Sequence, residues 1–472
     1  MMSWVHNRIL LPLCEPDQHM GLGRRLRELE RFDARPRQEQ LAIQEMRIRA
    51  ILDHAYETSP YYRSIFDEMR FRAVDWQPGQ PIPLPELTRE GLRTNLDNIC
   101  SRSVPPEQMR RTMTRGTTAP PMAICRDLEG LRNKTAMQIH LNRVSGYEQG
   151  MRVLHLWGVE RDQEDRASWL RRFYEEALLR RVNCGAGQLN DSACGSFLDA
   201  LNQQKSEVLY GYPSTLAVFA KWLRASGMPW HKPRFIIVTG EMMTGEQRRI
   251  VEETFVCEAI VHYGSRDIGM VAAECEAGRL HFHPWASYVE LLPAGQSPAG
   301  PLYRLVVTDL LNYGMPLVRY DTGDCVLYDE SPCPCGSWYP SVTAVLGRTV
   351  DHLVLPNGTL TAGLPVVMRA GRTFRTIRQV QLIQKKVDTM HLLFSAAGDG
   401  GSTDQELKEF LSDVEDAFRI PLQWTIERVP EIPREPSGKL RLAICEVPTD
   451  PYARAWHPPS EHAVAASSAA PN

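Results

Sequence analysis

The chain has 472 residues, which is long enough for more than one packed core, so we expect two or more domains. Hydrophobic residues make up 43% and charged residues 24%, as in an ordinary globular protein. The net charge of −3 lacks the basic excess of a nucleic-acid-binding protein, and no apolar run is long enough to span a bilayer. The first residues carry no basic stretch and no small-residue cleavage site, so we expect a cytoplasmic protein.

The first part of the chain predicts helices followed by an α/β sheet. Apolar residues recur three and four positions apart over residues 21–69, which indicates amphipathic helix, and Pro81, Pro83 and Pro85 then predict an extended connector. From residue 107 to 330, short β-branched or apolar runs that end in turn residues alternate with helical stretches. This repeat predicts a largely parallel sheet, and ligands of such sheets bind just beyond the carboxyl ends of the strands.

The later part of the chain predicts a second, smaller unit. Its pattern contains a hairpin at 378–396 and a capped amphipathic helix at 404–420. We therefore expect an α/β fold with a large N-terminal domain (1–347) of mixed or parallel sheets and helices, and a small α+β C-terminal domain (348–450). The Pro-, Ala- and Ser-rich residues 451–472 indicate a disordered tail.

Two segments carry residues suited to a nucleotide. Residues 112–121 gather threonines around Gly116, and their hydroxyl and backbone N–H groups can wrap phosphate oxygens, although the GxxxxGK[ST] pattern of a Walker loop is absent. Residues 263–269 (YGSRDIG) follow a predicted strand, where Asp267 can hold Mg²⁺ with one or two carboxylate oxygens. The alternatives are a solvent-exposed loop for the first segment and a helix cap by Ser265 or Asp267 for the second.

Three shorter motifs add charged groups. In RYDTGD, Asp321 and Asp324 flank a Thr-Gly turn and can accept hydrogen bonds from ribose hydroxyls, or form a plain Asx turn. In GRTVD, Arg348 is followed by Asp351. In PSGK, Lys439 is either a solvated surface residue or a lysine that a flexible approach delivers into a site formed elsewhere.

Together and in this order, these motifs resemble the acyl-adenylate-forming superfamily, and within it the branch of phenylacetate–CoA ligase-like and capsule-biosynthesis-ligase-like proteins. The resemblance runs from about residue 50 to residue 444. It rests on GYPSTL, VTGE, YGSRDIG, LHFHPW, TDLLNYGMPLVRYDTGD, CPCG, GRTVDHLVLPNG and PSGK. It implies a ligase that uses ATP and Mg²⁺ to activate a carboxylic acid, carries a mobile small domain, and transfers the acyl group to an acceptor, with CoA as the leading candidate.

The resemblance also implies roles for individual residues. The phosphate loop corresponds to Thr114, Arg115, Gly116, Thr117 and Thr118, and the strand-end turns that border the nucleotide or the acid correspond to Gly240, Glu241, Tyr263, Gly264 and Ser265. Asp267 stands at the position of a Mg²⁺-binding glutamate, with Arg266 beside it, and Asp324 and Arg348 stand at the ribose. Asp351 lies at the hinge, and Lys439 matches the mobile lysine that bridges the carboxylate and the α-phosphate during adenylation.

Four positions depart from the family pattern. Ala119 and Arg115 in the phosphate loop replace a glycine and a small residue, and Arg266 and Asp267 replace a threonine or serine and a glutamate. Because Asp is one methylene shorter than Glu, Mg²⁺ would sit closer or be held through water. The arginines are either compensating cations, since guanidinium groups bind phosphate bidentately, or a sign of an altered or lost nucleotide site. The lysine, ribose aspartate and arginine of the family are retained, so we expect an active enzyme.

The 11 cysteines are expected to be mostly buried thiols. Some relatives carry a set of metal-binding residue types that corresponds here to Cys275, His281, Cys333 and Cys335, with His283 as a rival to His281. Three thiolates and one imidazole form a closed, tetrahedral structural Zn²⁺ site. The alternative is that CPCG forms a tight turn with reduced thiols.

In relatives, the acid pocket lies between the GYPS turn and the strand before YG. The candidates here are Leu156, Trp157, Tyr212, Pro213, Val238 and His262, which would also make a good apolar core. Their character favours an aryl or other hydrophobic acid. Two other functions stay open: an amide or ester ligase that transfers the acyl group to an amine or hydroxyl without CoA, and a degenerate member kept for binding. The sequence also leaves a homodimer open.

Overall fold

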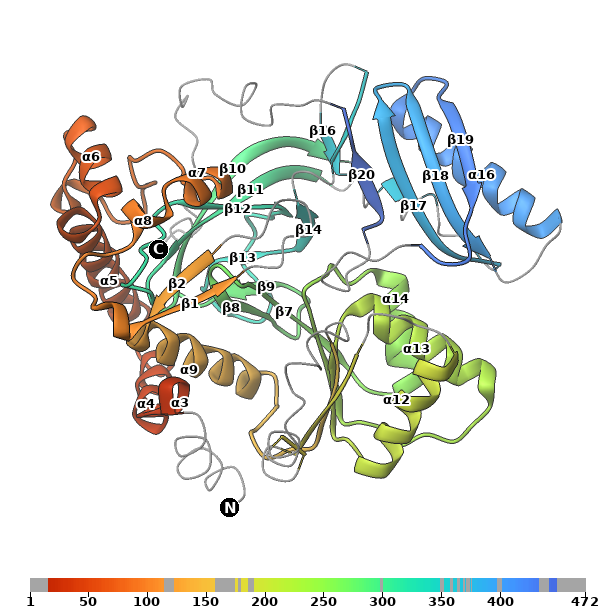
Figure 1. Cartoon of the computed structure of the whole chain (residues 1–472), viewed down its shortest axis with the longest axis horizontal. Coiled ribbons are helices and arrows are strands. Elements are labelled where there is room, and N and C mark those ends of the chain that lie inside the picture. Colours follow the sequence, from red (N-terminus) through yellow and green to blue (C-terminus); the bar gives the residue numbers. More distant parts are fainter. Residues whose placement is uncertain are drawn as a thin grey trace.

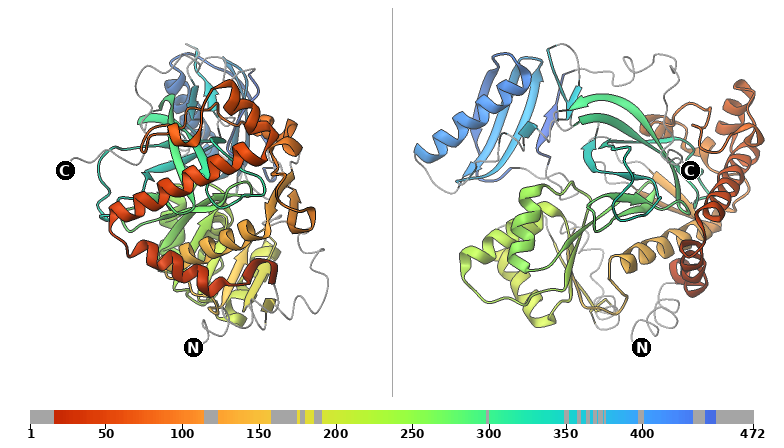
Figure 2. Two further views of the ribbon diagram at one scale, coloured as in Figure 1. Left: turned by 90° about the vertical axis from the view of Figure 1, so that its left-hand side faces the viewer. Right: turned by 180° about the vertical axis from the view of Figure 1, so that it is seen from behind.

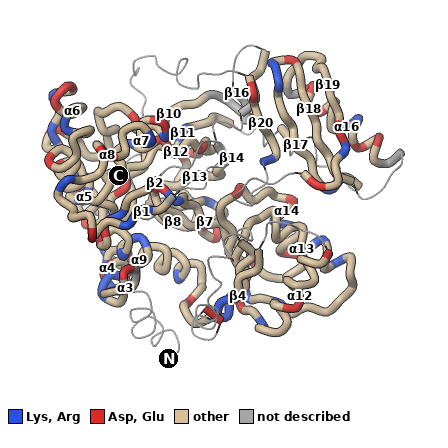
Figure 3. The backbone as a smooth tube through the Cα atoms, in the orientation of Figure 1, with Lys and Arg blue, Asp and Glu red and all other residues tan. Residues whose placement is uncertain are grey.

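The computed structural model describes residues 16–113, 123–157, 175–176, 180–185, 191–297, 300–348, 352–356, 360–362, 366–367, 370, 374, 376–396, 401–432 and 441–447. These residues form an N-terminal helical region, two large sheets with their covering helices, and a C-terminal α+β unit (Figure 1). Basic and acidic residues are interspersed along the described chain (Figure 3). None of the described helices is both long and apolar enough to cross a membrane.

The N-terminal helical region flanks the sheets on one side (Figure 2). The helices predicted over 21–69 are confirmed as α4 (Leu22–Asp33), α5 (Arg37–Thr58) and α6 (Pro60–Glu68). The helix is interrupted between α5 and α6 because Ser59 leaves the helical conformation. Its hydroxyl accepts a hydrogen bond from the Tyr62 N–H. The shorter elements of this region are α3 (Pro16–His19), η2 (Ala73–Asp75), α7 (Arg89–Thr94), α8 (Leu96–Ile99) and η3 (Pro106–Gln108).

The first large sheet has eight strands in the order β13-β9-β8-β7-β6-β5-β3-β4. Its strands are β3 (Val153–Leu156), β4 (Arg181–Cys184), β5 (Val208–Gly211), β6 (Phe235–Thr239), β7 (Ala259–Ser265), β8 (Gly269–Glu274), β9 (Leu280–Phe282) and β13 (Ser341–Val342). The β4-β3-β5-β6-β7 part is parallel, whereas β8, β9 and β13 join in antiparallel fashion. The sheet is therefore mixed, because a parallel unit is extended at β7 by a hairpin.

Helices cover both faces of this sheet. One face packs against α12 (Asp191–Gln204), α13 (Pro213–Ser226) and α14 (Gly245–Phe255) through an apolar core that includes Val238. On the other face, α9 (Leu128–Val144) packs against β8. Two of these helices begin at side-chain caps: Asp127 accepts from the Gly130 N–H, and Thr244 forms a capping box with Gln247.

The second large sheet is antiparallel and has the order β10-β11-β12-β14. Its strands are β10 (Ser287–Ser297), β11 (Gly300–Asp309), β12 (Tyr320–Leu327) and β14 (Ala344–Arg348). A core of buried side chains that includes Tyr263, Tyr288 and Tyr320 lies between this sheet, the N-terminal helices and the first sheet. A separate hairpin, β1 (Met109–Met113) and β2 (Ala123–Asp127), flanks residues 114–122.

The C-terminal unit has a core of its own, built from residues between Leu353 and Ala443. The predicted hairpin is confirmed as β17 (Ile377–Lys386) and β18 (Thr389–Ala396), and the predicted helix as α16 (Gly401–Phe418). This helix begins three residues before the predicted start, so the residues predicted to cap it lie inside its first turn. The sheet is completed by β19 (Gln423–Arg428) and β20 (Ala443–Cys445), and a short hairpin of β15 (His352–Val354) and β16 (Leu360–Ala362) precedes it. The domain boundary at 347/348 stays a prediction, and the tail at 451–472 lies outside the described residues.

Candidate functional site

The carboxyl ends of four adjacent parallel strands bring several of the predicted site residues together. Trp157 follows β3 and Tyr212 follows β5, and their rings stack with centroids 4.2 Å apart. Thr239 at the end of β6 is in register with His262 of β7. In a parallel sheet this edge is where ligands bind, so the row forms one wall of the candidate site.

Gly240 closes this row with a backbone shape that only glycine adopts easily. Its φ is +83°, and a Cβ added there would lie 2.9 Å from Tyr212 Cε1 and 3.2 Å from Trp157 Cη2. The next residue, Glu241, accepts a hydrogen bond from the Ser214 N–H at 3.2 Å, which places its carboxylate at the N-terminus of α13. Pro213 occupies the first turn of that helix, directly after Tyr212, so the start of α13 adjoins the wall.

A hydrogen bond connects the two large sheets at the predicted ribose position. The Tyr263 hydroxyl donates to Asp324 Oδ2 at 2.6 Å. Asp324 is in register with Arg348 across β12 and β14, so the predicted pair of residues lies at one point of the second sheet. By contrast, Asp321 is buried, forms an ion pair with Arg304 and accepts from the Gly323 N–H, which makes it an Asx turn rather than a ligand-binding carboxylate.

Asp267, the expected Mg²⁺ ligand, is already engaged. Its side chain is 7% exposed, and its Oδ2 atom accepts from the Tyr320 hydroxyl at 2.7 Å and from Arg89 at 3.3 Å. A guanidinium cation therefore lies against this oxygen, and the role of Asp267 in Mg²⁺ binding stays a prediction. Ser265 takes the capping role, since its hydroxyl accepts from the Asp267 and Ile268 N–H groups.

The neighbouring turn is held by tight backbone packing. The backbone carbonyl of Arg266 accepts a hydrogen bond from Arg126 of β2, whose pKa is lowered by burial. A Cβ on Gly264 would lie 2.7 Å from Met270 Cα, so this turn also requires glycine. Lys134 of α9 donates to the Ile268 carbonyl at 2.5 Å. The hairpin β1–β2 and α9 therefore both anchor the YGSRD turn.

The four predicted zinc ligands converge. Cys275 Sγ lies 3.6 Å from Cys333 Sγ, Cys335 Sγ lies 3.4 Å from His281 Nε2, and the four ligand atoms are all within 4.8 Å of one another. Tetrahedral Zn²⁺ with bonds of about 2.3 Å to sulfur and about 2.0 Å to nitrogen requires S···S near ~3.8 Å and S···N near ~3.5 Å. The residues present therefore fit the metal.

The histidine tautomer agrees with this set. His281 Nδ1 lies 3.0 Å from the Tyr339 carbonyl, and because a carbonyl only accepts, Nδ1 carries the proton and Nε2 presents its lone pair to the cluster. The rival, His283, instead pairs with Asp33 at 3.0 Å, together with His140 at 2.7 Å from the same carboxylate. The geometry thus selects His281.

Several predicted site residues cannot be placed with the others. Val238 faces the core beneath α12–α14, the opposite side from His262, so it does not line the same wall. Leu156 packs in that same core. Outside the described residues lie the phosphate-loop positions Thr114, Arg115, Gly116, Thr117, Thr118 and Ala119, the hinge residue Asp351 and the mobile lysine Lys439, and of Arg348 only the backbone is described.

The sequence interpretation missed three contributors to the site: Arg89, Arg126 and Lys134. Each acts on the YGSRD turn from at least 130 positions away in the chain. Nothing local distinguishes them from solvated cations, because only the tertiary fold brings them to the turn.

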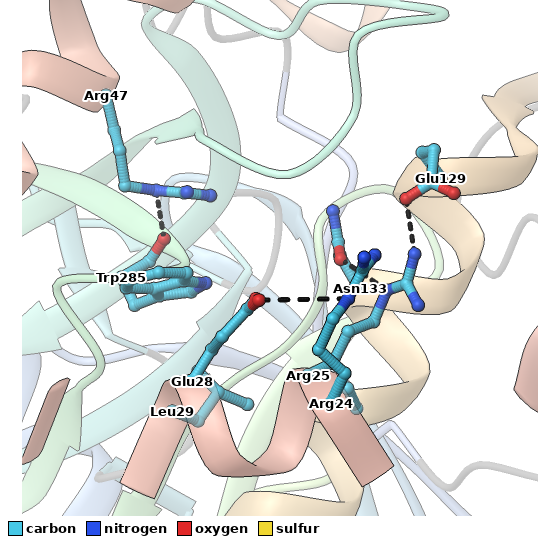
Figure 4. A pocket seen from close by; sticks show the side chains of 9 residues that line it. Arg24, Arg25, Glu28, Leu29, Arg47, Glu129, Asn133 and Trp285 are labelled. Atoms are coloured by element: carbon cyan, nitrogen blue, oxygen red, sulfur yellow. Dashed lines mark hydrogen bonds and ion pairs between the residues drawn. The ribbon is translucent and has the colours of Figure 1, made fainter. Parts of the chain in front are cut away.

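A pocket of about 190 Å³ lies elsewhere, between α4, α5, α9 and Trp285 (Figure 4). Arg47 stacks over the Trp285 ring, with its guanidinium carbon 4.3 Å from the ring centroid. Arg25 pairs with Glu129 at the other wall. None of the predicted site residues lines this pocket, so it is not the candidate site.

Comparisons with known proteins agree with this architecture. No family model matches the chain. The CapK protein of Staphylococcus aureus is 21% identical over 407 residues, covering 85% of this chain and 88% of that protein. A phenylacetate–coenzyme A ligase of Thermus thermophilus is 24% identical over 439 residues, covering 87% and 97%.

Solved structures show the same fold. A 2-hydroxyisobutyryl-CoA ligase in its postadenylation state, with an acyl-AMP bound, superposes with a TM-score of 0.67 at 16% identity, covering 88% of this chain and 90% of that one. An anthranilate CoA ligase in complex with anthranoyl-AMP gives a TM-score of 0.50 at 13% identity, over 70% and 65% of the two chains. The mixed α/β fold expected from the sequence is confirmed.

Proposed function

The chain belongs to the adenylate-forming superfamily, with phenylacetate–CoA ligases and CapK among its homologues, and on that premise we propose that it joins a carboxylic acid to AMP and then transfers the acyl group to CoA. One observation carries the proposal. The hydrogen bond from Tyr263 to Asp324 brings the strand-end turn of the first sheet against the ribose position of the second. This is where the family's nucleotide would bridge the two sheets.

The chemistry requires cations at the reacting groups. Attack of a carboxylate on the α-phosphate brings two anions together, so the site must neutralise charge as it develops. We assign this role to the donor-rich loop at 114–118 and to Lys439, with Arg115 and Arg266 as added cations. Asp324 and Arg348 would hold the ribose, and Gly240 and Glu241 would border the adenine. Asp267 would hold Mg²⁺ through its other carboxylate oxygen, Oδ1, since Arg89 pairs with Oδ2.

The acid pocket is assigned to the wall of Trp157, Tyr212 and His262, with Pro213 at its edge. Trp157, which stacks on the buried Tyr212, is the partly exposed ring of this pair, and a flat aromatic face favours an aromatic acid. CoA is the favoured acceptor because a related structure, with a TM-score of 0.53, holds CoA together with an acyl-AMP. The C-terminal unit, with its separate core, would act as the mobile domain that hinges at Asp351 and delivers Lys439.

The first test is acid-dependent release of pyrophosphate from ATP, measured over a panel of aryl and alkyl acids. Release that depends on the acid supports adenylation, whereas no release with any acid, while ATP still binds, supports a binding protein. Adding CoA or an amine in a second step, and measuring the product mass, identifies the acceptor. A product formed with the amine alone would overturn the assignment of CoA.

The second test separates the half-reactions. Lys439→Ala should lose adenylation by about 100-fold or more, since a positioned charge in a water-excluded site is worth several kcal/mol. The same variant should convert supplied acyl-adenylate to thioester at close to the normal rate. Lys386→Ala, an exposed lysine of β17, is the matched control. An unchanged adenylation rate in Lys439→Ala would remove the lysine from the mechanism.

We also propose that Cys275, His281, Cys333 and Cys335 hold a structural zinc ion, on the strength of the distances given above. Closed sites with four protein ligands serve folding rather than catalysis. One equivalent of zinc in the purified protein supports this assignment, and protein that is active without zinc and folds normally would refute it.

A further inference from the structure

His262 occupies a position that joins the core to the candidate acid pocket. It precedes Tyr263 in β7 and is in register with Thr239 at the carboxyl end of β6. Because side chains alternate along a strand, and Val238 packs in the core under α12–α14, Thr239 and its register partner His262 face the other side, where Ser145 lies at the end of α9. It is 1% exposed. A ligand that reached this wall would meet its imidazole ring without competing water.

The hydrogen bonds around His262 fix its tautomer. Its Nε2 atom lies 2.7 Å from the Ser145 hydroxyl, and that hydroxyl donates its single proton to the Leu141 carbonyl at 3.1 Å. Ser145 must therefore accept from the His262 Nε2–H group. Burial also lowers the pKa of His262 to about 4, so the ring is neutral near pH 7. The Nδ1 atom is consequently a hydrogen-bond acceptor.

This acceptor has no partner among the described residues. Nδ1 is buried, and no donor within the described part of the chain reaches it. Asn142 of α9 lies three positions before Ser145, on the same side of the helix, and its Oδ1 atom is likewise buried and unpartnered there. Buried polar atoms are normally paired, so the unpartnered His262 Nδ1 atom calls for a donor.

We propose that the acid activated by this chain carries a hydroxyl or amino group that donates a hydrogen bond to His262 Nδ1, which makes His262 a specificity-determining residue. The inference rests on the proposed function, because it names the substrate class of the same site. Its physical basis is the rejection of substrates that leave a buried partner unpaired, which is stronger than the rejection of an extra methylene. An acid without the donor would desolvate Nδ1 and give nothing in return.

The test uses pyrophosphate release with matched acids. Benzoate and phenylacetate are compared with their hydroxy, amino and fluoro derivatives at each ring position. The wild type should prefer one hydroxy or amino acid over its parent by about 5- to 150-fold in kcat/KM, the range expected for one buried acceptor. The fluoro analogue, of similar shape but without a proton to donate, should behave like the parent or worse. Equal kcat/KM values for donor and parent acids in the wild type would overturn the inference without any variant.

Variants locate the effect. His262→Leu should bring the ratio of donor acid to parent acid close to one, chiefly by improving the parent. Ser145→Ala frees the ring to adopt the other tautomer, so the ratio should fall while the overall fold is kept. His391→Leu, in the C-terminal sheet, is the matched control and should keep the wild-type ratio. A ratio that survives in His262→Leu would overturn the role of His262.

The two levels of the proposal fail in different ways. If no acid releases pyrophosphate, the proposed function fails and the inference about His262 fails with it. If acids are activated without regard to a donor group, adenylation stands and the inference about His262 is wrong.

Discussion

The buried pair of Lys134 and Asp309 yields the sharpest test of how the site is anchored. Lys134 Nζ lies 2.5 Å from Asp309 Oδ2 and 2.5 Å from the Ile268 carbonyl, and the two side chains are 7% and 1% exposed. Burial lowers the pKa of Lys134, and Asp309 opposes that shift. Replacing Lys134 by methionine keeps the unbranched stem of the side chain, one atom shorter, but leaves the Asp309 carboxylate without its buried cation.

We expect Lys134→Met to reduce the free energy of unfolding by about 3–5 kcal/mol, the usual cost of removing one partner of a buried ion pair. For a large domain this corresponds to a loss of about 6–20 °C in Tm. The measurement is urea unfolding followed by tryptophan fluorescence, with Tm as a second readout. Lys221→Met is the matched control, because Lys221 pairs with Glu246 at 3.5 Å on the surface and should cost below about 1 kcal/mol.

A second substitution tests the cause. Asp309→Asn keeps an oxygen for the Leu311 N–H, which Asp309 Oδ1 accepts at 3.0 Å, but removes the charge. The double variant with Lys134→Met should therefore be more stable than Lys134→Met alone by at least about 1 kcal/mol. If Lys134→Met costs no more than Lys221→Met, or if the double variant loses the sum of both single changes, the reasoning from burial is refuted.

Three further predictions concern the metal, the glycine turn and pH. Cys335→Ser should lose bound zinc and lower Tm by several degrees, whereas Cys257→Ser should keep both; zinc retained at one equivalent in Cys335→Ser would contradict the cluster. Gly240→Ala should raise the KM for ATP about 10-fold or more, because the added Cβ would meet Tyr212 and Trp157 at a residue with positive φ. Gly245→Ala is the control and should leave the KM nearly unchanged, because no atom lies within 4 Å of the added Cβ. Equal effects of the two substitutions would contradict the close packing at Gly240. The pKa of His262 is lower in the folded chain, about 4, than its ordinary 6.5, so the unfolded chain binds the extra proton and stability falls as pH drops from 6.5 to 4, by up to about 3 kcal/mol. In His262→Gln the free energy of unfolding should fall less between pH 6.5 and 4 than in the wild type. If the free energy of unfolding depends on pH in the same way in both proteins, His262 does not titrate as described.

Local structure could be predicted from the sequence, because the periodicity of helices and strands depends on residues that are close together in the chain. The helices over 21–69, the hairpin at 378–396 and the helix at 404–420 all follow from such patterns. The candidate zinc ligands were predicted for a different reason. The pattern of relatives named three cysteines and one of two histidines, and in the fold His281 lies beside the cysteines whereas His283 pairs with Asp33.

Two features could not be predicted from local patterns: the face of the sheet on which a side chain lies, and its contacts with residues distant in the sequence. Val238 and His262 lie at neighbouring strand ends, and which of them faces the site depends on strand register, since a shift of one residue exchanges the faces. Asp267 matches a family position, yet its carboxylate meets Arg89, 178 positions earlier in the chain. Such contacts form only in the complete fold, so no local sequence pattern predicts them.

The positions of the proposed zinc ligands along the chain have a consequence for the second sheet. His281 and Cys333 are separated by 52 positions, and the segment between them contains all of β10, β11 and β12, including Asp324. A metal that stayed bound to both residues would close this segment into a ring in the unfolded chain. In the simple cross-link model, the lost conformational entropy of the unfolded chain stabilises the fold by about 4 kcal/mol. Asp324, on β12, would then lie inside a segment whose two ends the metal holds together, so a local opening of β12 would leave those ends joined.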